Sequence, residues 1–130
     1  MSTPPVKTKL LYVDDDPILS QLVPLVLEQQ GLQVQTASNG REGVEMALAW
    51  LPDLILMDLT MPIMDGFQAA ATLRADPRTR HIPIVALSGT SEAHELAKVQ
   101  ELGMNGFILK SGSSTDLIKT IRAYLPPKND

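Results

Sequence analysis

The sequence has no cysteine, and its aromatic residues are limited to one tryptophan, two tyrosines and two phenylalanines among 130 residues. Without cysteine the chain can form no disulfide framework, no thiolate nucleophile and no cysteine-based zinc site. No apolar run approaches the roughly 18 residues that a membrane-spanning helix needs, and residues 1–5 lack the apolar region of a signal peptide. We therefore expect a cytoplasmic protein without a membrane segment.

An excess of positive charge is also missing. The formal net charge is −4 and no basic run or stripe is present, which argues against nucleic acid as a direct partner. Hydrophobic residues make up 44% and charged residues 20% of the chain, which is typical of a single globular domain with a substantial core. We expect a short disordered lead at residues 1–6, a folded domain at residues 7–125 and a tail at residues 126–130.

Five short apolar segments alternate with five segments of helical periodicity. The expected strands cover residues 9–13, 32–37, 54–57, 81–87 and 107–109. The expected helices cover about residues 17–30, 40–51, 67–75, 91–102 and 114–125, and Pro24 is expected to kink the first of them. This alternation with short connections predicts an α/β fold, in which a parallel five-stranded sheet carries helices on both faces.

Polar side chains stand where the expected strands end. Asp14 and Asp15 follow the first strand, and Asp58 follows the very apolar third strand. Ser88 ends the fourth strand and Lys110 the fifth. Because the carboxyl ends of parallel strands share one edge of the sheet, where ligands bind in open α/β folds, these five side chains are expected to face one pocket.

The chemistry of this set points to phosphoryl transfer. Three neighbouring carboxylates repel one another, and a hard cation such as Mg²⁺ relieves the repulsion while leaving room for a phosphate oxygen. Asp58 is the expected nucleophile because its strand is the most apolar and hence the most central. Asp14 and Asp15 would hold the metal, while Lys110 and Ser88 supply a positive charge and a hydrogen-bond donor around the transferred oxygens.

Four segments together resemble the receiver domain of two-component response regulators. The resemblance runs over about residues 7–125, and the matching segments are Leu11–Pro17, Asp53–Gly66, Pro83–Gly89 and Phe107–Lys110. It implies a flavodoxin-like (βα)5 fold with three α/β/α layers and strand order 2-1-3-4-5. It also implies that a sensor histidine kinase or a histidine phosphotransfer protein phosphorylates Asp58 in a Mg²⁺-dependent or Mn²⁺-dependent reaction.

The resemblance assigns further roles by position. Asp15, Asp58 and the backbone carbonyl of Thr60 would ligate the metal directly, and Asp14 would act through water. Ser88 and Lys110 would bind phosphoryl oxygens. Ser88 and Phe107 would form the switch pair that reports phosphorylation to the face of the fourth helix, fifth strand and fifth helix, where an output protein binds.

The resemblance also implies a signalling domain that catalyses only its own phosphoryl transfer and dephosphorylation, and it leaves open a phosphorylation-dependent dimer. The sequence departs from the family pattern in three places. Ser111 follows Lys110 where the family usually has a proline in a cis bond, and a cis bond costs roughly 3 kcal/mol without proline. Thr60 and Thr90 occupy positions that tune phosphoryl lifetime, and Pro24 interrupts a helix that often contacts kinases.

Three alternative functions differ from this interpretation. An aspartate-nucleophile phosphatase needs an acid two residues after the nucleophile, where this chain has Thr60. A flavin or dinucleotide module needs a glycine-rich phosphate loop after the first strand, where this chain has three aspartates. The remaining alternative is a receiver that is not phosphorylated and serves as a protein docking module. Phe107 has the alternative interpretation of a core aromatic residue, and Asp16 that of a helix-start residue.

Overall fold

The computed structural model describes residues 7–90 and 92–125, and in this part of the chain five parallel strands form a sheet of order β2-β1-β3-β4-β5. The strands are β1 (Lys9–Val13), β2 (Gln33–Ala37), β3 (Leu54–Asp58), β4 (Ile84–Ser88) and β5 (Gly106–Leu109). The predicted fold class and strand order are confirmed. The predicted lead at residues 1–6 and tail at residues 126–130 lie outside the described residues.

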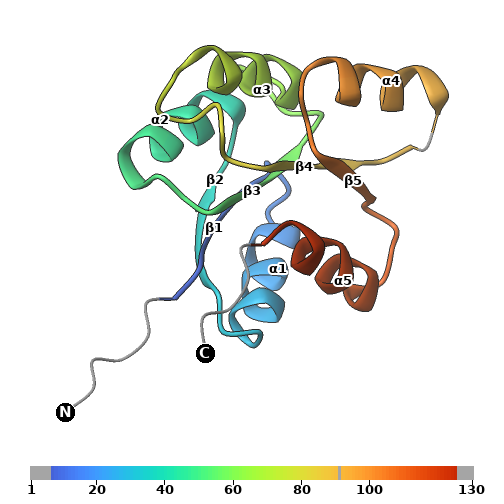
Figure 1. Ribbon diagram of the computed structural model, residues 1–130. Helices are drawn as coiled ribbons and strands as arrows, with labels where there is room; N and C mark the ends of the chain where they lie inside the picture. The colour runs from blue at the N-terminus through green and yellow to red at the C-terminus, as the bar shows by residue number, and fades with distance from the viewer. Residues whose placement is uncertain (1–6, 91, 126–130) are drawn as a thin grey trace.

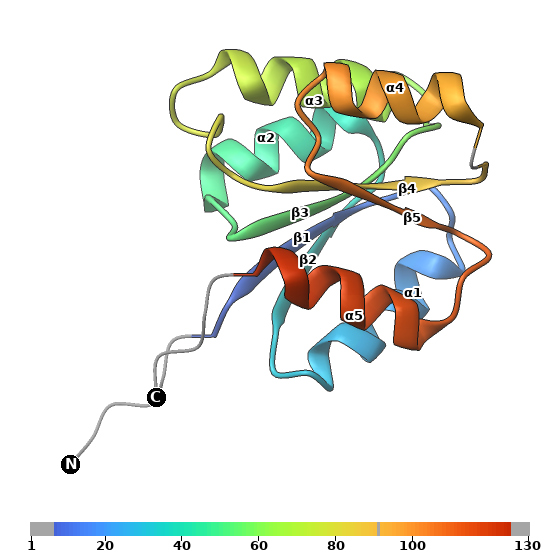
Figure 2. The ribbon, with the colours of Figure 1, turned by 45° about the vertical axis from the view of Figure 1, so that its right-hand side comes forward.

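Five helices cover the two faces of the sheet. They are α1 (Leu19–Glu28), α2 (Gly40–Trp50), α3 (Gly66–Ala75), α4 (Ala93–Glu101) and α5 (Ser114–Tyr124). Helices α1 and α5 lie on one face, and α2, α3 and α4 lie on the other (Figure 1, Figure 2). No helix within the described ranges is long and apolar enough to cross a membrane.

The burial of each strand follows its place in the sheet. Every residue of β3 and β4 is buried, which explains why both strands are nearly unbroken apolar runs. Strand β2 lies at the edge of the sheet, and only Ala37 in it is buried. Successive β1 residues supply the two cores in turn, with Leu11 and Val13 facing α2–α4 and with Leu10 facing α1 and α5.

Local capping sets most helix boundaries. The Asn39 side chain accepts a hydrogen bond from the Glu42 backbone N–H at 2.9 Å and thereby caps α2. Asp65 and Gln68 form a reciprocal capping box at α3, and the Ser113 hydroxyl caps α5. These polar side chains replace the partners that the first backbone N–H groups of a helix lack.

Two of the element boundaries that differ from the prediction have a local cause. Helix α1 begins at Leu19 rather than at Pro17, because the Asp16 carboxylate accepts hydrogen bonds from the backbone N–H groups of Ile18 and Leu19. The helix runs through Pro24, and the kink predicted there stays a prediction. Strand β4 begins at Ile84 rather than at residue 81, because the preceding residues form a turn in which the Ile82 N–H bonds to the Thr79 carbonyl at 3.0 Å.

Candidate functional site

The sheet brings the predicted side chains to one edge. Asp58 is the last residue of β3 and Ser88 the last of β4, while Asp14 and Lys110 directly follow β1 and β5. Strand β3 lies between β1 and β4, so Asp58 stands at the middle of this edge. Asp14, Asp58 and Ser88 expose only 1%, 2% and 1% of their surfaces, so these three polar groups have few water partners of their own.

Three carboxylates meet at the centre of this edge. Asp14, Asp15 and Asp58 each offer an oxygen atom within 4.8 Å of the other two, and Asp15 is exposed while the other two are buried. We call these three residues the acidic cluster. Carboxylate oxygens held this close suit a hard divalent cation, and the exposed Asp15 leaves the cluster open to solvent. The residues present therefore fit a Mg²⁺ or Mn²⁺ ion.

Lys110 contacts two members of the acidic cluster. Its Nζ donates to Asp58 Oδ2 at 2.9 Å and to Asp14 Oδ1 at 3.4 Å. Burial alone would lower the pKa of Lys110, but the hydrogen bond and charge of Asp58, together with Asp14, raise it overall. The bond from Lys110 to Ser111 is trans, since no cis peptide bond occurs in the described ranges. Lys110 thus stays charged and reaches both carboxylates without the family's cis proline.

Asp58 is held in an environment that disfavours its charge. Burial, and then the neighbouring Asp14 carboxylate, raise its pKa to about 7 against the opposing effect of Lys110. Its second oxygen, Oδ1, accepts a hydrogen bond from the Thr60 backbone N–H at 3.3 Å. In the absence of a cation a fraction of Asp58 is therefore protonated near neutral pH. A cation beside it would favour the ionised and nucleophilic form.

Tyr12 belongs to the site although sequence reasoning treated it as a strand residue. Its hydroxyl donates to Asp14 Oδ2 at 2.5 Å from a fully buried position. Burial and the hydrogen bond to Asp14 raise the pKa of Tyr12 well above its usual range, so it stays a donor. The Asp16 backbone N–H donates to Asp14 Oδ1 at 3.0 Å. The two-residue spacing on a strand, which puts Tyr12 and Asp14 on one face, would have indicated this contact.

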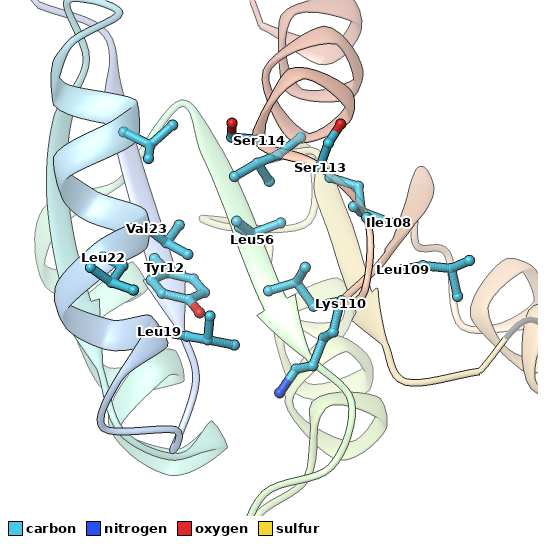
Figure 3. A pocket seen from close by; sticks show the side chains of 14 residues that line it. Tyr12, Leu19, Leu22, Val23, Leu56, Ile108, Leu109, Lys110, Ser113 and Ser114 are labelled. Atoms are coloured by element: carbon cyan, nitrogen blue, oxygen red, sulfur yellow. The ribbon is translucent and has the colours of Figure 1, made fainter.

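A cavity of about 140 Å³ lies beside Tyr12, between α1 and α5. Figure 3 shows Tyr12 on the α1 side of this cavity and Lys110 on the other side, with Leu56 between them on β3. The Tyr12 ring lines the cavity while its hydroxyl contacts Asp14. Tyr12 and Lys110 therefore connect this apolar space to the acidic cluster.

Two glycines let the loops pack closely behind Asp58. A Cβ atom on Gly66 would lie 2.2 Å from the Asp58 carbonyl oxygen, and one on Gly40 would lie 2.3 Å from the Met64 carbonyl oxygen. The backbone N–H groups of the same two glycines donate to Leu59 at 3.1 Å and to Met64 at 2.9 Å. The sequence marks Gly66 only as a loop residue, whereas the structure shows that it supports the backbone of Asp58.

The two predicted switch residues differ in their contacts. Ser88 Oγ lies 2.5 Å from the Thr90 carbonyl oxygen and 2.8 Å from Glu95 Oε1. Among the described residues it makes no hydrogen bond to Asp58 or Lys110, although the sequence places all three at one edge. Phe107 is partly buried and packs against the core beneath α2, α3 and α4. Sequence reasoning did not single out Glu95, because its contact depends on how the loop after β4 folds.

Comparison with known proteins agrees with this geometry. A family model for the response regulator receiver domain matches residues 10–122. The chain therefore belongs to the response regulator receiver family, a class of signalling domains. Receiver domains of two-component systems interact with histidine kinases and downstream effectors, and the acidic cluster is consistent with a phosphoacceptor site.

Individual relatives cover nearly all of the chain. PilH of Pseudomonas aeruginosa is 34% identical over 90% of this chain and 97% of its own length. The structure of Vibrio cholerae CheY4 has a TM-score of 0.88 at 29% identity and covers 92% of this chain and 100% of CheY4. The receiver domain of the sensor histidine kinase PA1611 from Pseudomonas aeruginosa has a TM-score of 0.84 at 26% identity, with 92% and 98% covered.

That structure of the PA1611 receiver domain has a magnesium ion coordinated in its active-site cleft. The length of the relatives varies widely. The chain spans 48%, 97% and 17% of the lengths of three curated relatives of similar identity.

Proposed function

We propose that Asp58 accepts a phosphoryl group from a phosphohistidine and that the domain thereby controls the binding of another protein. The observation that carries the proposal is the placement of Asp58. It is buried at the middle of the sheet edge, with Lys110 Nζ on one oxygen at 2.9 Å and the Thr60 N–H on the other at 3.3 Å. A carboxylate with a fixed cation and a fixed donor beside it suits attack on phosphorus.

In the proposed step a carboxylate oxygen of Asp58 forms a bond to phosphorus as the bond from phosphorus to the donor imidazole breaks. The electron pair of the broken bond stays on the imidazole nitrogen. Lys110 would then move its contact from the carboxylate to a phosphoryl oxygen, and the Ser88 hydroxyl would donate to another. The domain catalyses this transfer and the later hydrolysis of its own acyl phosphate, and it turns over no separate substrate.

Asp15, Asp58 and the Thr60 carbonyl would ligate Mg²⁺ or Mn²⁺, with Asp14 acting through water. The support is the 4.8 Å clustering of the three carboxylates and the magnesium ion in the PA1611 relative. When bound, the cation supplies neutralisation of the charge that gathers on the phosphoryl oxygens. Tyr12 and the Asp16 N–H would orient Asp14 in this assembly.

Partner contacts are proposed on two surfaces. Helix α1 and the residue just before it expose apolar side chains: Ile18, Leu22 and Leu25 expose 67%, 53% and 58% of their surfaces. A histidine kinase or histidine phosphotransfer protein would dock over these apolar side chains, which lie near Asp14 in the chain. The output protein, or a second phosphorylated copy, would contact the face of α4, β5 and α5 after Ser88 and Phe107 rearrange. We propose a cytoplasmic location, because the phosphoryl donor would have to reach Asp58 there.

The test is the intact mass of the protein after incubation with acetyl phosphate and Mg²⁺. We expect one phosphoryl group on the wild type, released by hydroxylamine and stable in acid. Asp58→Asn should acquire none. Asp116→Asn, which makes the same change at an exposed position in the first turn of α5, should acquire one, and omission of the metal should prevent the reaction.

The alternative function is an unphosphorylated docking module. It predicts that no protein adduct forms and that beryllofluoride, a phosphoryl mimic, does not bind in the presence of Mg²⁺. An adduct that survives in Asp58→Asn would contradict the assignment of Asp58 as the acceptor.

A further inference from the structure

The Ser88 hydroxyl is already engaged by groups outside the acidic cluster. A serine hydroxyl has one proton to donate, and the acceptors within reach of Ser88 Oγ are the Thr90 carbonyl at 2.5 Å and Glu95 Oε1 at 2.8 Å. One of its two lone pairs accepts from the Thr90 N–H at 3.1 Å. The one proton of the buried Ser88 hydroxyl is therefore used on the α4 side of the sheet edge.

Glu95 is placed for this contact by the start of α4. Its backbone N–H bonds to the Glu92 carbonyl at 3.1 Å, which fixes it in the first helical turn. The Glu95 side chain is partly buried, whereas the Glu92 side chain at the start of the same turn is exposed, and its carboxylate lies 3.4 Å from His94 Nδ1. A hydrogen bond to a carboxylate is stronger than one to a neutral carbonyl, so Glu95 is the more costly of the two acceptors to abandon.

A phosphoryl group on Asp58 would compete for the same proton. To donate to a phosphoryl oxygen, Ser88 must give up its contact with Glu95, and a buried hydrogen bond that is lost lowers the stability of the state that loses it. Such a bond present in only one of two states shifts the equilibrium between them toward that state. The Glu95 contact, which the structure shows in the unphosphorylated protein, would therefore favour the unphosphorylated arrangement.

We infer that Glu95 is a positioning residue that holds the Ser88 hydroxyl away from Asp58 and opposes the phosphorylated arrangement. The inference rests on the proposed function, because it concerns the regulation of the same site. It predicts that the apparent affinity of the wild type for a phosphoryl mimic equals the intrinsic affinity multiplied by the fraction of molecules in which Ser88 is free of Glu95.

The test measures the affinity of the full chain for beryllofluoride in Mg²⁺ by fluorine NMR or calorimetry. Glu95→Ala should bind about tenfold more tightly than the wild type, since it removes a charge-assisted hydrogen bond from the competing state. Glu95→Gln keeps an acceptor oxygen but no charge, and it should bind only about threefold more tightly. Glu92→Ala removes the same charge from the same turn without touching Ser88 and should match the wild type.

A second background separates hydrogen bonding from general electrostatics. In Ser88→Ala protein, which binds the mimic more weakly, adding Glu95→Ala should change the affinity no further, because the two residues act through one contact. Thermal unfolding of each variant verifies that it is folded.

Each other outcome overturns the inference. Equal affinities for Glu95→Ala and the wild type would mean that the Thr90 carbonyl alone holds the proton. Equal gains for Glu95→Ala and Glu95→Gln, or a gain that persists in Ser88→Ala, would mean that only the charge of Glu95 acts. If the wild type binds no beryllofluoride at all, the proposed function fails together with the inference. If the wild type binds beryllofluoride measurably and Glu95→Ala binds it with the same affinity, the inference fails while the proposed function stands.

Discussion

The two ends of the sheet use charged side chains in opposite ways. At the carboxyl ends of the strands, Asp14, Asp58 and Lys110 are paired with one another, and the negative charges outnumber the positive one. At the amino ends, the charged side chains of Arg74 and Lys9 are paired mainly with backbone carbonyl groups. The clustered carboxylates at the carboxyl ends suit a chemical reaction, whereas the contacts between cations and carbonyls at the amino ends join segments of the fold.

Arg74 shows how the amino ends are joined. From the last turn of α3 its guanidinium donates to the carbonyl oxygens of Gly103, Arg80 and Ile82 at 3.0, 3.0 and 2.7 Å. It also donates to Asn105 Oδ1 at 2.9 Å, and that oxygen accepts the Ile84 N–H at 2.9 Å. One side chain therefore links α3 to the segments that begin β4 and β5, and its fork of five donors is well used.

The charged groups at the two ends of the sheet also differ in how they affect stability. An arginine that donates to backbone carbonyls has no competing protonation state near neutral pH, so its contacts contribute to stability at every ordinary pH. Asp58, by contrast, has a pKa raised to about 7 by burial and by Asp14, so its ionised form is destabilising. The ionised carboxylates at the carboxyl ends of the strands thus lower the stability of the fold, and a bound cation or a phosphoryl group on Asp58 can relieve this effect.

The largest expected effect is at the amino ends. Arg74→Ala should lower the free energy of unfolding by about 3 kcal/mol, because it removes several charge-assisted hydrogen bonds and leaves the partly buried Ile82 carbonyl without this donor. Denaturant unfolding monitored by circular dichroism measures the change. Arg74→Lys should recover only part of the loss, since one ammonium cannot reach all of these acceptors.

The matched control for Arg74 is Arg78→Ala. Arg78 lies just beyond the end of α3 and is exposed, and its guanidinium pairs with the Asp76 carboxylate at 2.8 Å. An exposed ion pair contributes little, so the unfolding midpoint should stay close to that of the wild type. Equal losses for the two variants would show that the contacts of Arg74 with backbone carbonyls carry no special weight.

The next effect has the opposite sign. Asp58→Asn should raise the free energy of unfolding at pH 8 by about 1 to 2 kcal/mol when no divalent cation is present, because it removes a destabilising buried charge. Removing a charge would then stabilise the protein at the carboxyl ends of the strands, in Asp58→Asn, and destabilise it at the amino ends, in Arg74→Ala. Denaturant unfolding at several pH values measures it.

The pH dependence gives the control. Because the pKa of Asp58 is raised from 3.8 to about 7, the folded wild type binds more protons than the unfolded chain between these values. Its stability should therefore fall as the pH rises from about 4 to about 7, and the advantage of Asp58→Asn should grow over the same range. Mg²⁺ should reduce that advantage by stabilising the wild type. An advantage that stays constant with pH would contradict the raised pKa.

Much of this architecture could be predicted from the sequence. The apolar runs that end on Asp14, Asp58, Ser88 and Lys110 predicted both the parallel sheet and the edge at which these residues meet. Periodicity gives the class of fold, because a buried strand and an amphipathic helix differ in their spacing of apolar residues. The strand order came from the resemblance of four segments to receiver domains, and composition alone does not contain it.

The contacts that were not predicted depend on how loops and side chains fold. Glu95 reaches Ser88 only because the loop after β4 places the first turn of α4 over the sheet edge. Arg74 contacts residues 6 to 31 positions away, and no local pattern marks these carbonyls as its acceptors. Sequence periodicity therefore indicates which face a residue occupies, while the partner of a long polar side chain requires the three-dimensional arrangement.

The smallest expected effect concerns Lys9, at the same end of the sheet as Arg74. Its Nζ donates to the Trp50 carbonyl at 2.9 Å and lies 5.4 Å from the centre of the Trp50 ring. Lys9→Met should lower the free energy of unfolding by only about 0.5 to 1 kcal/mol, since the methionine retains the apolar stem. The backbone N–H of residue 9 also keeps its 2.8 Å hydrogen bond to Asp53.

The emission of Trp50, the one tryptophan in the chain, provides a local reading of this change alongside denaturant unfolding. Lys7→Met, which alters an exposed lysine two residues earlier, should change neither the emission nor the midpoint. A loss for Lys9→Met as large as that for Arg74→Ala would mean that a single carbonyl contact stabilises the amino ends as much as several do. The contribution of Lys9 or Arg74 to the free energy of unfolding would then not depend on how many backbone carbonyls the side chain contacts. The difference between the two ends of the sheet would instead come from how deeply their charged groups are buried.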